Sequence, residues 1–101
     1  MAIRHSEETD ALFRSVLALG SVEECYAYFE DLCTVKEVRD LSQRLEVARL
    51  LDAGSSYQQA AAATGASSTT IGRVKRCLEY GTGGYRMVLG RLKEADARDD
   101  G

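Results

Sequence analysis

Basic and hydroxyl side chains gather in one stretch of the sequence, YQQAAAATGASSTTIGRVKRCL, residues 57–78. Its second half carries neighbouring hydroxyl groups, then guanidinium and ammonium groups: Ser67, Ser68, Thr69, Thr70, Arg73, Lys75 and Arg76. These groups donate hydrogen bonds, and no Asp or Glu between Ala53 and Leu78 offsets the positive charges. The chemistry that this pattern supports is therefore the binding of an anion, above all a polyanion that carries phosphates.

The charge of the whole chain is distributed unevenly. The 101 residues have a formal net charge of −3, whereas Arg73, Lys75 and Arg76 give residues 53–78 a charge of +3. The rest of the chain therefore carries −6, the difference between these two values. An acidic protein with one basic face can attract phosphate locally without being basic overall.

Residue types that support catalysis or metal binding are few. The lone His5 lies near the start, and Cys25, Cys33 and Cys77 have neither C-x-x-C spacing nor an identifiable base partner. The sequence GTGG at 81–84 lacks the lysine and hydroxyl pattern of a nucleotide-binding loop. The sequence thus predicts neither an enzyme nor a metal site, and three reduced thiols are typical of a cytoplasmic protein.

Two helices joined by a glycine turn are predicted to position the basic residues. The predicted helices Tyr57–Thr64 and Ser68–Tyr80 outline a helix-turn-helix over about residues 57–79. Ala60 and Ala61 are small enough for two helices to cross closely, and Gly65 accepts a left-handed backbone without a Cβ clash.

The second of these helices has an apolar face and a polar face. Ile71, Val74 and Leu78 recur at i, i+3 and i+7 and are predicted to pack on the first helix. Gly72 is either a point where the backbone approaches DNA closely or a tolerated surface glycine. The residues predicted to meet DNA, with Lys75 acting only on the phosphate backbone, are Ser67, Ser68, Thr69, Thr70, Gly72, Arg73, Lys75 and Arg76.

The whole chain has the composition of an all-α protein. It contains no proline, 45% hydrophobic residues and much Ala, Leu, Arg and Glu. Capping-box patterns begin predicted helices at Ser21 and Glu24, at Thr34 and Glu37, and at Ser56 and Gln59. The predicted helices span about Glu8–Leu19, Val22–Leu32, Val35–Ala53, Tyr57–Thr64, Ser68–Tyr80 and Tyr85–Ala95.

These helices are predicted to form one domain over residues 1–101, with a charged, frayed tail at 96–101. Tyr26 and Phe29 are predicted to face inward. The first two helices carry apolar residues on more than one side, which favours burial of the excess against a second copy of the chain. No apolar run approaches the length of a membrane span, and the first ten residues lack the apolar stretch of a signal peptide. We therefore expect a cytoplasmic protein.

Residues 32–92 resemble the Trp-repressor superfamily, and in particular its YerC/YecD branch. The motifs that carry the resemblance are QRLEVARLL, TGAS, TIGRVKRCL followed by Y-G two residues on, and GGY. The resemblance implies an all-α, interlocked homodimer with two helix-turn-helix heads, each presenting its second helix to the major groove. Half-sites would then lie about 34 Å apart, one turn of DNA.

The resemblance also bears on an effector. In tryptophan-responsive members, two arginines hold the amino acid, and the matching positions here are Arg44 and Arg73, with Thr34 at a pocket-lining position. Those members have a glycine where this chain has Val74, whose side chain would fill the space of the indole, and the turn is one residue shorter. Tryptophan is therefore not expected as a co-repressor. Another small effector, or none, remains open.

The sequence favours a DNA-binding transcriptional regulator, with repression as its expected effect. The alternative is a helical protein-interaction module that retains the fold without DNA recognition. It is supported by the short side chains of ASSTT, which offer little for bidentate contact with bases.

Overall fold

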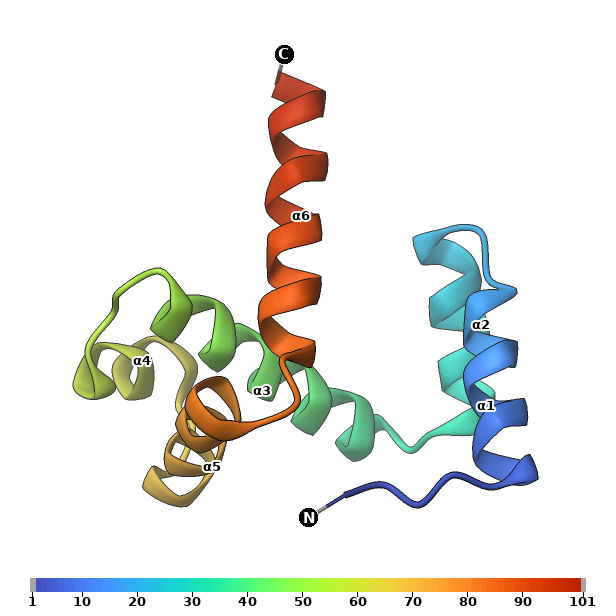
Figure 1. The fold of residues 1–101 in the computed structure, drawn as a ribbon, viewed down its shortest axis with the longest axis horizontal. Helices are drawn as coiled ribbons and strands as arrows, with labels where there is room; N and C mark the ends of the chain where they lie inside the picture. Colours follow the sequence, from blue (N-terminus) through green and yellow to red (C-terminus); the bar gives the residue numbers. More distant parts are fainter. Residues whose placement is uncertain (1, 101) are drawn as a thin grey trace. The chain divides into compact units, whose positions relative to one another are not determined.

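The computed structural model describes residues 2–100, and this part of the chain contains six helices and no strand (Figure 1). The helices are α1 (Glu7–Leu17), α2 (Val22–Leu32), α3 (Val35–Asp52), α4 (Tyr57–Thr64), α5 (Ser68–Tyr80) and α6 (Gly84–Asp100). The predicted all-α class is confirmed. The chain divides into two compact units, residues 1–38 and 39–101, so α3 begins in the first and continues in the second.

The first unit places α1 beside α2, and the Ser15 hydroxyl and the Tyr28 hydroxyl share a hydrogen bond of 2.6 Å between them. Helix α1 begins one residue earlier than predicted, because the Ser6 hydroxyl accepts from the backbone N–H of Thr9 and caps it. It also ends two residues earlier than predicted, at Leu17, and beyond this end the N–H of Leu19 donates a hydrogen bond to the carbonyl of Val16.

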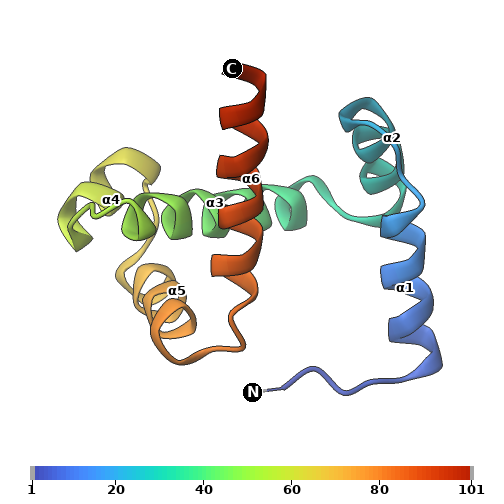
Figure 2. The ribbon, with the colours of Figure 1, turned by 45° about the horizontal axis from the view of Figure 1, so that its top comes forward.

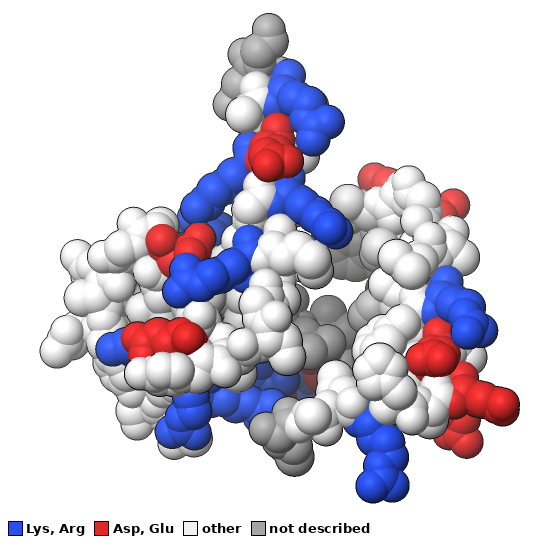
Figure 3. All heavy atoms as spheres, in the orientation of Figure 1, with Lys and Arg blue, Asp and Glu red and all other residues white. Residues whose placement is uncertain are grey.

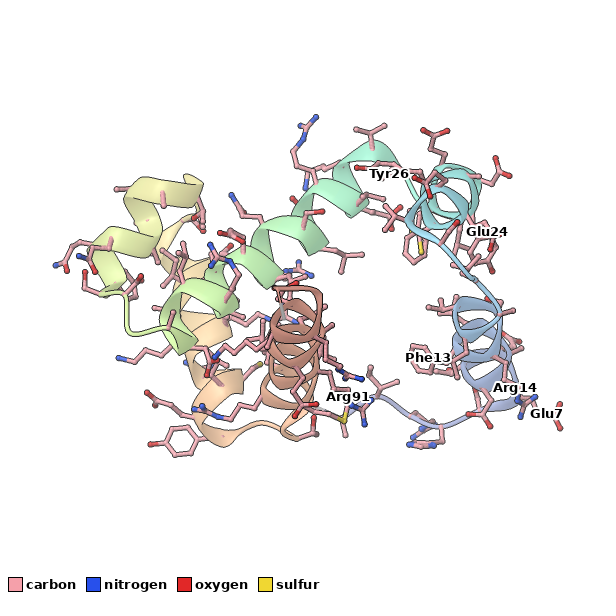
Figure 4. All side chains as sticks on the ribbon, turned by 90° about the horizontal axis from the view of Figure 1, so that it is seen from above. Glu7, Phe13, Arg14, Glu24, Tyr26 and Arg91 are labelled. Carbon is pink, nitrogen blue, oxygen red and sulfur yellow. The ribbon has the colours of Figure 1, made fainter. Side chains whose placement is uncertain are left out.

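Two details of α2 differ from the prediction. Tyr26 is 68% exposed rather than inward-facing, and Figure 4 shows its side chain projecting from α2. Tyr28, two residues on, faces α1 instead, because residues two apart do not share a helix face. Ser21 caps the helix as predicted, but the Glu24 carboxylate accepts from the N–H of Gly20, at 2.7 Å, rather than from that of Ser21.

Neither α1 nor α2 contains a buried residue. Figure 4 shows the ring of Phe13 projecting away from α1. The large apolar side chains that these two helices expose are Leu12, Phe13, Leu17, Val22, Tyr26 and Leu32. Among its described residues, the first unit therefore has no buried apolar core of its own.

The second unit holds the core, which α3, α4, α5 and α6 surround (Figure 2). Its buried residues are Val47, Ala48, Ala60, Ala66, Ile71, Val74, Leu78 and Leu89. On α3 the core-facing residues are Val47 and Ala48, with Leu51 packed beside them. The apolar positions Val35, Leu41 and Leu45 of the same helix are exposed.

Local signals set the helix boundaries of this unit. The Ser56 hydroxyl and the Gln59 side chain form the predicted reciprocal capping box at the start of α4. Gly54, with φ of +99°, lies just beyond the end of α3. Helix α6 continues to Asp100, five residues past its predicted end at Ala95. No helix among the described residues has the length and apolar character needed to cross a membrane.

Candidate nucleic-acid interface

Helices α4 and α5 form the predicted helix-turn-helix (Figure 2). Ala60 is fully buried, so the two helices approach closely there. Gly65 ends α4 with φ of +71° and ψ of 9°, and its N–H donates to the carbonyl of Ala61 at 2.9 Å. The predicted left-handed turn at Gly65 is confirmed.

A polar residue, Thr64, occupies the end of α4. Its hydroxyl donates to the carbonyl of Ala60 at 2.8 Å and accepts from the N–H of Ala66 at 3.2 Å. The side-chain amide of Gln43, on α3, donates to the carbonyl of Thr64 at 3.2 Å. These bonds satisfy the hydroxyl and the carbonyl of Thr64 and connect the turn to α3. They explain why the turn tolerates a hydroxyl at this position.

The first turn of α5 is held by side-chain hydrogen bonds. The Ser67 hydroxyl caps the helix by accepting from the N–H of Thr70 at 3.2 Å, and it also bonds the Thr70 hydroxyl at 3.1 Å. From α4, the Tyr57 hydroxyl donates to the carbonyl of Ser68 at 2.6 Å. Ser67 and Thr70 thus shape the start of the helix, whereas Ser68 and Thr69 are exposed beside them.

Helix α5 has the two faces that the sequence predicted. Ile71, Val74 and Leu78 are buried. Four of the predicted DNA-binding residues follow the spacing i, i+3, i+4 and i+7, which places them together on another face: Thr69, Gly72, Arg73 and Arg76.

This face is open along its backbone. Arg73 and Arg76 are exposed, and a Cβ atom added to Gly72 would meet nothing within 4 Å apart from its chain neighbours and the backbone of its own helix. Lys75 is exposed too, but it lies four residues from Ile71 and so flanks the buried side. In Figure 3, Lys and Arg side chains gather along the lower edge of the molecule beside α5. The arrangement can bind a polyanion through backbone and guanidinium groups at once.

Arg44 and Arg73 lie within electrostatic reach of one phenol, that of Tyr85 on α6. Burial raises the pKa of Tyr85, the negative charge of an ionised Cys77 raises this pKa further, and the two arginines oppose the rise. Thr34, the third residue of the expected effector pocket, is exposed in the other unit. The second unit therefore holds two of the three expected residues, and the charges of both act on Tyr85.

A separate hollow of about 240 Å³ opens where α3, α4, α5 and α6 meet. Its lining includes Tyr57, Lys75, Leu78 and Arg86, but neither Arg44 nor Arg73. Among the described residues, no three His, Cys, Asp or Glu side chains are grouped as a metal site would require.

A family model described as Trp repressor protein matches residues 7–93. The chain belongs to the Trp repressor family. Among its relatives in this family, the chain is 53% identical over 90 residues to the uncharacterized protein YerC of Bacillus subtilis, an alignment that covers 89% of this chain and 86% of YerC.

Two solved structures of Trp repressor type share the fold. One is a protein of Staphylococcus aureus provisionally assigned as a Trp repressor, with a TM-score of 0.86 and 45% identity over 88% of this chain and 89% of that one. The other is a Trp repressor-like protein of Eubacterium eligens, with a TM-score of 0.84 and 44% identity over 87% of this chain and 91% of that one. The Trp repressor family and the all-α fold of the chain inferred from the sequence are confirmed.

The structure adds three residues to the Trp repressor-type head that the sequence did not single out. Gln43 anchors the turn, Tyr57 holds the first turn of α5, and Tyr85 is subject to the charges of the two arginines. The sequence could have drawn attention to Tyr57, because it is an aromatic residue directly after Ser56, which caps α4. The roles of Gln43 and Tyr85 depend on contacts between distant helices, which no local pattern predicts.

Proposed function

We propose that the protein is a sequence-specific DNA-binding transcriptional regulator that acts in the cytoplasm as a homodimer and represses its targets. The observation that carries this proposal is the exposed face of α5, where Arg73 and Arg76 flank an open backbone at Gly72 in a segment without acidic residues. Membership of the Trp repressor family supports it.

Each residue of this face has a role that follows from its chemistry. The guanidinium groups of Arg73 and Arg76 are suited to bidentate contact with guanine or with a phosphate. Ser68 and Thr69, in the first turn of α5, present hydroxyls and backbone N–H groups to a phosphate. Lys75, at the flank, adds a point charge for the DNA backbone. Gly72 lets the helix backbone approach the groove.

The homodimer is supported by the apolar surface of the first unit. Helices α1 and α2 bury none of their residues, and they expose Leu12, Phe13, Leu17 and Val22. Two helices without a core do not remain ordered on their own, because burial of apolar surface must offset the loss of chain entropy. A second copy of the chain supplies the missing surface, and it also supplies the second recognition helix that a two-fold symmetric operator requires.

Tryptophan does not fit this chain as a co-repressor. Val74 is 1% exposed within the core, so its branched side chain takes the room that an indole would need. We therefore expect the affinity for DNA to be the same with and without tryptophan, measured by fluorescence anisotropy of a labelled operator. A tenfold or larger gain in affinity for DNA on adding tryptophan would show that the side chain of Val74 does not exclude the indole.

The proposal is tested by selecting random duplex DNA with the purified protein and sequencing the bound pool. We expect a two-fold symmetric motif with half-sites about one helical turn apart. Arg76→Glu should then weaken binding to the selected operator by at least about tenfold. The matched control is Arg91→Glu, the same charge change at an exposed site on α6 (Figure 4), with little expected effect. If Arg76→Glu bound the operator as tightly as the parent, α5 would not be the helix that reads DNA.

A second candidate function is a helical protein-interaction module, favoured by the short side chains of Ser67, Ser68, Thr69 and Thr70 at the start of α5. Salt dependence separates the two functions. Binding to phosphates weakens steeply as salt rises, because the protein displaces counterions from the DNA, whereas an apolar protein interface lacks this dependence.

A further inference from the structure

Arg86, near the start of α6, bonds to two other helices. Its Nε donates to the carbonyl of Leu78 on α5 at 3.1 Å, and one Nη pairs with Oδ1 of Asp52, at the end of α3, at 3.2 Å. Nζ of Lys93, further along α6, pairs with Oδ2 of the same carboxylate at 3.1 Å. The side chain of Asp52 is only 15% exposed, whereas those of Arg86 and Lys93 are 58% and 64% exposed, so the carboxylate is the shielded member of this junction.

The carbonyl of Leu78 belongs to the last turn of α5, where backbone carbonyls lack partners within the helix. The N–H of Gly81 donates a hydrogen bond to the carbonyl of Cys77, and Nε of Arg86 donates one to the carbonyl of Leu78. The chain between α5 and α6 is short and contains Gly81 and Gly83, the latter with φ of +89°. Because glycines restrict the backbone least, this connection by itself constrains the angle between the two helices weakly.

Helix α5 is therefore held by directional bonds at both ends. Tyr57 fixes its first turn through the carbonyl of Ser68, and Arg86 fixes its last turn through the carbonyl of Leu78. Between them, the buried side chains of Ile71 and Val74 pack on the core. Apolar burial is non-directional, so it keeps α5 on the core without setting its tilt as closely as hydrogen bonds do.

We infer that Arg86 is a positioning residue for DNA reading. Through the Leu78 carbonyl and the Asp52 carboxylate, it sets the orientation of α5 against α3 and α6. In a dimeric reader, this orientation decides which separation of half-sites both recognition helices can meet at once. The inference rests on the proposed function and adds to it a determinant of operator spacing that touches no base.

The test uses the operator selected by the parent protein and two derivatives, with one base pair added or removed between the half-sites. Arg86→Lys keeps the charge but replaces the planar fork by a single ammonium, which cannot hold both partners in fixed directions. We expect this variant to lose about tenfold of the parent's discrimination between correct and altered spacing, equivalent to one charge-assisted hydrogen bond. Asp52→Asn, of nearly the same shape, should act in the same direction, and the double variant should add little to either.

Arg91→Lys, on the same helix, is the matched control and should leave spacing discrimination unchanged. All affinities are measured below the unfolding temperature of each variant, with helix content checked by circular dichroism. Loss of stability alone lowers the binding to all three operators equally and leaves their ratios unchanged. A smaller ratio of the affinity for the correctly spaced operator to the affinity for an altered one therefore indicates a change in the orientation of α5.

The other outcomes are distinct. If the parent selects no DNA motif, the proposed function fails and this inference fails with it. If the parent discriminates between spacings and both Arg86→Lys and Asp52→Asn do so equally well, DNA reading stands and the positioning role is overturned. If Arg86→Gln weakens binding to all three operators equally and lowers the salt dependence by about one counterion, Arg86 contacts a phosphate instead.

Discussion

Gly72 is the residue at which protein stability and DNA binding are expected to oppose each other. Glycine inside a helix costs about 1 kcal/mol relative to alanine, and an added Cβ at this position meets nothing within 4 Å apart from its chain neighbours and the backbone of its own helix. Gly72→Ala should therefore raise the free energy of unfolding by about that amount while weakening DNA binding by at least about tenfold, since a methyl group would separate the helix from the groove. Urea unfolding and fluorescence anisotropy measure the two effects.

Gly90 offers a matched control for this prediction. It lies inside α6, and an added Cβ there also meets nothing within 4 Å. Gly90→Ala should stabilise the chain by a similar amount and leave the affinity for the operator unchanged. If Gly72→Ala binds DNA as tightly as the parent, Gly72 is a tolerated surface glycine rather than a point of close approach.

At the scale of single residues, the sequence predicted a residue's role correctly where the backbone conformation or the helical spacing determines it. Gly65 was predicted because a left-handed turn excludes most side chains, and Ile71, Val74 and Leu78 because their spacing makes one stripe. It failed for Tyr26, since two neighbouring tyrosines in one helix are equally apolar and only the position of α1 decides which one is covered.

At the scale of elements, the capping box at the start of α3 couples this helix to pH. The backbone N–H of Thr34 donates to the Glu37 carboxylate at 2.8 Å, and the Glu37 N–H donates to the Thr34 hydroxyl at 3.1 Å. The bond from the Thr34 backbone, and then that from its hydroxyl, hold the pKa of Glu37 below its ordinary value near 4.5. A lowered pKa means that the carboxylate stabilises the folded state above pH 4.5 and loses this contribution as pH falls through the lowered value.

Glu37→Gln keeps a side chain that can accept the Thr34 N–H but does not titrate. This variant should therefore show a smaller loss of stability than the parent between about pH 5 and the lowered pKa of Glu37. Thermal unfolding followed by circular dichroism across that range compares the two. Identical pH profiles would mean that the capping carboxylate contributes nothing measurable to folding.

Helix boundaries were predictable to the extent that caps set them. The bounds of α2, α4 and α5 agree with the sequence prediction because Ser21, Ser56 and Ser67 accept backbone N–H groups at their starts. Helix α1 begins one residue before its predicted start because Ser6, which belongs to no predicted capping box, caps it. The bond from Arg86 to Asp52 of α3 escaped prediction because it joins residues 34 positions apart.

At the scale of the whole molecule, the sequence indicated excess apolar surface but not how it is covered. Leu17 is 83% exposed on α1, and a leucine that stays in water contributes little to folding. In a chain that remained a monomer, Leu17→Glu would thus change stability by no more than about 0.5 kcal/mol. In a dimer whose second copy covers α1, the same change places a carboxylate in an apolar interface and should shift the protein towards monomer.

Sedimentation equilibrium should therefore give twice the monomer mass for the parent and a lower average mass for Leu17→Glu at the same micromolar concentration. The unfolding temperature of the parent should rise with protein concentration, because association stabilises only the folded chains. Tyr80→Glu, at an equally exposed position at the end of α5, serves as the control and should keep the mass of the parent. A parent that sediments as a monomer at every concentration would leave the apolar face of α1 and α2 without its proposed partner, and two-fold symmetric reading of DNA without its basis.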